Sequence, residues 1–120
     1  MSDNERFHRW SLAESDLVDL TPLKVRDIII KCFFEAQKET FSRTKQELGM
    51  KTSEEELYAT VKTSIRMVFK DIKADFDNPT KDDLMKVVDA LARKASSWGT
   101  PQDIIQFHGG QITKVLQILK

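Results

Sequence analysis

The sequence predicts an all-α protein, an antiparallel bundle of four main helices with the last one broken at Gly109-Gly110 and an N-terminal arm or short helix in front. Three observations predict this class. Apolar residues recur every three or four positions along most of the chain, which is the helical period. Helix-capping residues directly precede each of these stretches. Four glycines and three prolines are too few for the many tight turns of a β-sandwich or barrel.

The N-terminal region is expected to form a tail and a short helix. Residues 1–10 are polar for the most part and lack the apolar core of a signal peptide, so we expect a disordered tail. Residues 11–120 are expected to form one domain. Ser11 and Glu14 have the spacing of a capping box, which predicts a short helix over 12–19. Three apolar side chains could dock this helix on the domain: Trp10, Leu17 and Leu20.

The first long helix is expected to begin at Pro22, with Thr21 as its N-cap, because proline suits the first helical position. The pattern continues to Leu48, and Gly49 can end the helix in a left-handed conformation. The first half is apolar over a wide arc, so this helix is expected at the centre of the bundle. Its two apolar strips are Ile30, Phe33, Phe34, Gln37, Phe41, Thr44 and Leu48, and Val25, Ile29, Cys32 and Ala36.

The second long helix is expected to start at Thr52 or Ser53 and to stop at 77–79, where Asp-Asn-Pro is a breaker. Three glutamates at 54–56 fall in its first turn, where negative charge is favourable. One stripe of apolar residues marks the buried face: Leu57, Val61, Ile65, Val68, Ile72 and Phe76.

The third helix is expected to follow Thr80 as its cap and to end at Gly99, with Leu84, Val87, Val88, Leu91, Ala95 and Trp98 on its buried face. The fourth is expected to follow the cap Thr100 and Pro101. Two adjacent glycines cost a helix interior about 2 kcal/mol relative to alanines. We therefore expect two short helices, 101–108 and 111–119, with one kinked helix as the alternative. One helical phase nevertheless joins Ile104, His108, Ile112, Val115 and Leu119.

Charge and cysteine content limit the functional class. Nineteen basic and nineteen acidic residues give a net charge of zero, which argues against a general polyanion binder. The single cysteine, Cys32, lies in an apolar run and is expected to be a small buried side chain. It cannot form an internal disulfide, which fits a reducing compartment. No apolar run approaches the length of a membrane span, so a cytoplasmic location without membrane contact is expected.

The chain contains no recognisable catalytic, cofactor or metal-binding motif. The two histidines, His8 and His108, are far apart, and no Cys-x-x-Cys or His-x-x-x-His pair is present. Glu35 and Glu39 lie one turn apart and are expected on a solvated face. His108 is expected at the edge of the core or at a helix C-terminus rather than in a dyad with Cys32. We therefore predict no cofactor, no metal and no enzymatic activity.

One surface feature stands out, a stripe of like charge on the second long helix: Lys62, Arg66, Lys70 and Lys73. Cations at this spacing repel one another by a few tenths of a kcal/mol per pair. The stripe could contact phosphates or an acidic partner, or it could be a solvated face relieved by Asp71 and Asp75. We expect a non-enzymatic interaction or regulatory module that binds protein, another chain or itself as a homodimer. Nucleic-acid or phosphate binding through the stripe is the alternative.

Overall fold

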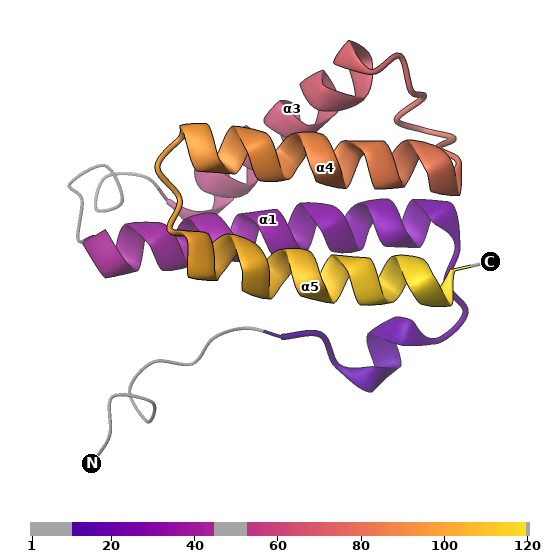
Figure 1. The fold of residues 1–120 in the computed structure, drawn as a ribbon, viewed down its shortest axis with the longest axis horizontal. Coiled ribbons are helices and arrows are strands. Elements are labelled where there is room, and N and C mark those ends of the chain that lie inside the picture. Colours follow the sequence, from indigo (N-terminus) through magenta and orange to yellow (C-terminus); the bar gives the residue numbers. More distant parts are fainter. Residues whose placement is uncertain (1–10, 45–52, 120) are drawn as a thin grey trace.

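The computed structural model describes residues 11–44 and 53–119. These residues form one short 3-10 helix, four α-helices and no strand, which confirms the predicted all-α bundle. No described helix is both long and apolar enough to cross a membrane. The predicted tail 1–10 and the predicted end of the first long helix at Leu48-Gly49 lie outside the described residues. The elements are η2 (Glu14–Leu17), α1 (Pro22–Thr44), α3 (Glu54–Asp71), α4 (Lys81–Ser97) and α5 (Gln102–Ile118) (Figure 1).

Helix α1 is the central helix, in contact with α3, α4 and α5. In Figure 1, α1, α4 and α5 lie side by side, and α3 crosses behind α4 at an angle and extends beyond it. Helix α5 runs opposite to both α1 and α4, which run in the same direction. Helices adjacent in the sequence therefore pack in opposite directions, as short connections predict.

The core is built from the predicted apolar stripes. On α1 the burial extends around most of the helix, as expected for a helix surrounded by its neighbours. The other helices each bury one face: Val61, Ile65, Val68 and Phe69 from α3, Leu84, Val87, Leu91 and Ala95 from α4, and Ile104, His108, Ile112, Val115 and Leu116 from α5. Leu12, Leu17 and Leu20 pack against this core from the N-terminal side, as predicted for the last two.

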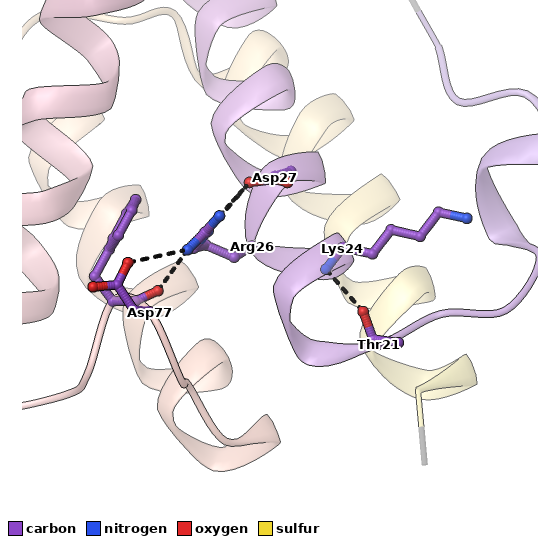
Figure 2. Close-up of polar contacts among 6 residues, drawn as sticks. Thr21, Lys24, Arg26, Asp27 and Asp77 are labelled. Carbon is purple, nitrogen blue, oxygen red and sulfur yellow. Dashed lines mark hydrogen bonds and ion pairs between the residues drawn. The ribbon is translucent and has the colours of Figure 1, made fainter.

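The start of α1 fixes the turn that follows α3. Thr21 caps the helix, because its Oγ1 accepts a hydrogen bond from the Lys24 amide at 3.1 Å (Figure 2). Arg26 donates to the Phe76 carbonyl at 2.7 Å and contacts Asp27 at 2.9 Å. Its side chain also lies 4.0 Å from the Asp77 carboxylate (Figure 2). One guanidinium thus holds the α3–α4 connection against α1.

Helix α3 ends at Asp71, six residues before the breaker that the sequence suggested. The residue after its C-cap, Lys73, adopts a left-handed conformation with φ 63°. The Lys73 amide donates to Lys70 and the Ala74 amide to Phe69, the two bonds of a Schellman motif. Phe76 then folds back so that its ring meets Phe69 edge-on at 5.2 Å. The predicted stripe was therefore right as far as Val68, but its last member belongs to the connection.

The residues predicted to begin and end α4 do so, but one residue of its predicted buried face is exposed. Thr80 Oγ1 accepts from the Asp83 amide and the Asp83 carboxylate accepts from the Thr80 amide, each at 3.1 Å, a complete capping box. Gly99 ends the helix at φ 85°. The error concerns Trp98, which was expected in the buried face but is half exposed, because it occupies the C-cap and only tilts against Phe33.

Helix α5 is continuous from Gln102 to Ile118, so the predicted break at Gly109-Gly110 is wrong and the one-helix alternative is right. The shared phase of the apolar residues on both sides decided the outcome, because their burial outweighs the helix propensity lost at two glycines. The expected cap was also misplaced. Pro101 is the N-cap, and Thr100 is buried with its hydroxyl near the Gln37 amide nitrogen at 3.3 Å.

The N-terminal segment contains the predicted short helix, but the helix is of the 3-10 type and covers 14–17 instead of 12–19. It forms a single 3-10 turn, and the Ser11–Glu14 capping box is absent as the start of a helix. Asp16 takes over that role, because its carboxylate accepts from the Ala13 amide at 2.9 Å. The segment is joined to the bundle by a hydrogen bond from the Leu12 amide to Gln111 Oε1 at 2.7 Å.

Candidate functional site

The predicted basic stripe lies on the outer side of α3. Arg66 and Lys70 are exposed and Lys62 is half-buried, and these three residues are called the α3 basic face below. The fourth predicted member, Lys73, is exposed but lies beyond the helix in the left-handed turn, so its assignment to the helical stripe was wrong. The α3 basic face therefore follows about two turns of helix and ends before the α3–α4 connection.

Neither Asp71 nor Asp75 relieves this charge in the way the sequence allowed. Within residues 11–44 and 53–119, no carboxylate lies within ion-pair distance of the three cations of the α3 basic face. On the other described helices, five cations have a carboxylate within reach, among them Lys31 with Glu35 at 2.9 Å, Lys86 with Asp82 at 3.3 Å, and Arg93 with Asp89. The other four described cations on those helices have none: Lys24, Lys81, Lys94 and Lys114. The described cations on α3 differ in that three unpaired charges lie together on one side of a single helix, so α3 presents its positive charge to solvent.

Arg66 is held in place by an aromatic ring. Its guanidinium lies 4.6 Å from the centre of the Phe76 ring, and the Arg26 guanidinium lies 4.3 Å from the same ring. A cation over an aromatic face is attracted by the ring quadrupole, by about 0.5–1 kcal/mol at exposed sites. This contact fixes Arg66 on the surface, and it also covers the Phe76 ring.

An apolar side chain accompanies the charges. Met67 follows Arg66 on α3 and is 60% exposed, the most exposed of the large apolar side chains in the described residues. A flexible thioether on an otherwise basic surface is typical of protein-binding sites, where methionine adapts to the partner. The α3 basic face and Met67 together make a mixed basic and apolar surface.

A second polar group is buried inside the bundle. His108 Nε2 lies 3.6 Å from Glu39 Oε1, and the two side chains are only 5% and 4% exposed. His108 Nδ1 lies 3.4 Å from Gln111 Nε2. The expectation that Glu39 faces solvent is wrong, because α1 turns this position toward α5. His108 is buried in mid-helix, so of its two expected places the helix C-terminus is wrong and the apolar face of the core is right.

A small apolar cavity adjoins His108. It has a volume of about 50 Å³ between α1, α4 and α5 and is lined almost entirely by carbon, with Phe33, Leu91 and Ile112 among its walls. A volume of this size holds a water molecule or two rather than a metabolite, since ligand pockets usually measure about 300–1,000 Å³. The histidine pair therefore belongs to the core of the bundle.

Cys32 is fully buried in the structure, as predicted. Burial raises the pKa of its thiol to about 12, and the charges of Glu35 and Asp16 act in the same direction. The thiolate needed for nucleophilic chemistry is therefore disfavoured. Glu35 contacts Lys31 at 2.9 Å and Lys38 at 3.7 Å.

No three His, Cys, Asp or Glu side chains come together as metal ligands in the part of the chain that the structure describes. Comparison of the chain with protein-family models, curated proteins and solved structures finds no match. The sequence located the α3 basic face correctly but gave no signal for the burial of Glu39, because a glutamate on a charge-rich helix is usually solvated.

Proposed function

We propose that this protein is a non-enzymatic interaction module that binds an acidic protein surface through the α3 basic face and Met67. The observation that supports this best is the contrast in pairing. Within the described residues, all three neighbouring cations of the α3 basic face lack a carboxylate within reach, whereas five of the nine described cations on the other helices have one. A partner that supplies carboxylates would relieve the repulsion between Lys62, Arg66 and Lys70.

The chemistry of the surface favours a protein over a nucleic acid. Met67 stands among the cations and would be left without a contact on a phosphate backbone, whereas an amphipathic acidic helix offers both carboxylates and apolar side chains. Phe76, the aromatic ring that Arg66 contacts, is covered by two guanidinium groups and is not open for base stacking. The chain also has no net positive charge to draw it to polyanions.

The proposal is tested by titrating the protein against two fluorescent probes, an amphipathic peptide rich in glutamate and leucine and a random-sequence DNA duplex. The test variant is Lys62→Glu/Lys70→Glu. Its matched control is Lys94→Glu/Lys114→Glu, which changes the net charge equally on α4 and α5, and Lys94 occupies the last turn of α4 as Lys70 does that of α3.

We expect the peptide to bind the wild type and the control alike, and the test variant to bind at least tenfold more weakly. Because two charge contacts become repulsive, the loss should be largest at low salt. Tighter binding of the duplex than of the peptide would replace the proposal by nucleic-acid binding. Absence of binding to both probes at low ionic strength would reject both functions.

A further inference from the structure

A different face of the bundle carries the second feature of interest, an alternating row of charges along α4. Asp82, Lys86, Asp89 and Arg93 follow one another at spacings of four, three and four, so they fall within one narrow stripe of the helix. All four side chains are well exposed, from 62% to 74%. They form two ion pairs within the helix, Asp82 with Lys86 at 3.3 Å and Asp89 with Arg93. This set is called the α4 ridge.

We propose that the α4 ridge pairs with the α4 ridge of a second copy of this chain, in an antiparallel two-fold dimer. When the row is read in the opposite direction, each charge meets one of opposite sign, so the α4 ridge is complementary to a second, antiparallel copy of itself. An axis through the middle of the helix, between Val87 and Val88, sets Asp82 opposite Arg93 of the other copy and Lys86 opposite Asp89. Both contacts occur twice in a symmetric dimer, because each copy presents the same surface.

The parallel arrangement is disfavoured by the same charges. A two-fold axis along the helix would set every residue opposite its own copy, so each of the four charges would meet a like charge. Interhelical charge pairs of this kind set the partner and the orientation of paired helices. The order of the four residues therefore selects the antiparallel dimer over the parallel one.

A groove beside the ridge extends the surface. It measures about 580 Å³ and lies between α4 and α5. Ala92, Gly109 and Gly110 line part of it with short side chains or none. A Cβ atom added at either glycine would meet no atom within 4 Å, so packing within the chain does not require glycine here. Because a stable dimer buries about 1,200 Å² or more of surface in total, we assign the groove to the same interface as the α4 ridge.

Met85 fits this arrangement. It stands at the edge of the groove and is 51% exposed. The axis that pairs the charges brings Met85 of one copy to within a turn of the other copy's Ala92, where the short side chains leave room. A methionine is well suited to filling such an irregular gap. The dimer does not rest on the function proposed for the α3 basic face, because the two surfaces use different helices.

The test uses two double variants, Asp82→Lys/Lys86→Asp and Asp89→Arg/Arg93→Asp, with light scattering over a concentration series. Each variant keeps the net charge and both ion pairs within the helix, but it makes all four charge contacts between copies repulsive. We expect a dimer for the wild type and an association weakened about 30-fold or more for each variant alone. Mixed together, the two variants become complementary again and should form a heterodimer.

Recovery in the mixture separates loss of pairing from loss of folding, because neither variant could be rescued by its counterpart if its bundle were disrupted. A wild type that stays monomeric over the whole series would overturn the proposal. So would double variants that associate as well as the wild type, or a mixture that remains monomeric.

Discussion

Replacement of Gly109 and Gly110 by alanine should stabilise the protein, although both glycines are natural residues of the chain. The two positions lie in the interior of α5, and an added Cβ meets nothing within 4 Å at either of them. Alanine is favoured over glycine in a helix interior by about 1 kcal/mol, because glycine loses more backbone freedom on folding. The double variant should therefore gain about 2 kcal/mol in free energy of unfolding, or roughly 8 °C in melting temperature.

The assay is urea unfolding followed by far-ultraviolet circular dichroism, at low protein concentration so that self-association adds nothing to the apparent stability. Gly99→Ala is the matched control. Gly99 has φ 85°, a conformation in which a side chain is strained, so the same substitution should destabilise by about 1 kcal/mol there. A double variant at 109 and 110 that is neutral or less stable than the wild type would show that α5 is not a continuous helix.

Three further predictions concern the core and a cap. Glu39→Ala and His108→Ala should each lower the free energy of unfolding by about 3 kcal/mol, since each leaves a buried partner behind. A double-mutant cycle should show clear coupling between the two positions, and additive losses would refute the pairing. Cys32 should resist alkylation at pH 8 until the chain is unfolded, and rapid labelling of the native protein would contradict its burial. The stability that the protonated Cys32 thiol contributes should be complete below pH 9.0 and should be lost as the pH rises toward about 12. Thr80→Ala should cost about 1 kcal/mol in urea unfolding through the lost cap, whereas Thr80→Ser should cost little.

The periodic spacing of apolar residues was enough to predict the bundle. Val61, Ile65 and Val68 are buried where a 3.6-residue period places them, and Thr21 and Thr80 cap the helices as expected. These predictions succeeded because they depend on local chemistry, namely the amphipathic face and the free amides at a helix start.

The errors arose where contacts distant in sequence overrode local preference. Gly109-Gly110 favours a break locally, but Ile104 and Val115 are buried on one face and keep α5 continuous. Helix α3 stops at Asp71 although the apolar period continues, because the chain turns back there toward Arg26. The shared apolar phase across Gly109-Gly110 was the signal for a continuous α5, whereas the apolar period gave no signal that α3 ends at Asp71.

The candidate site divides in the same way. The α3 basic face could be located from its spacing, because exposed charges on one side of a helix depend only on the helical period. Whether those charges are compensated could not be predicted, since any carboxylate that reached them would come from a segment distant in sequence. The burial of Glu39 against His108 is of the same kind, because it results from the packing of α1 on α5.

The most direct test of the proposed function is a map of amide chemical-shift changes by nuclear magnetic resonance while the acidic amphipathic peptide is added to the isotope-labelled protein. We expect the largest changes on residues 62–73, around Lys62, Arg66, Met67 and Lys70, and we expect them to diminish as salt is raised. Changes concentrated on α4 and α5, or none at saturating peptide, would contradict the assignment of α3 as the partner-binding surface.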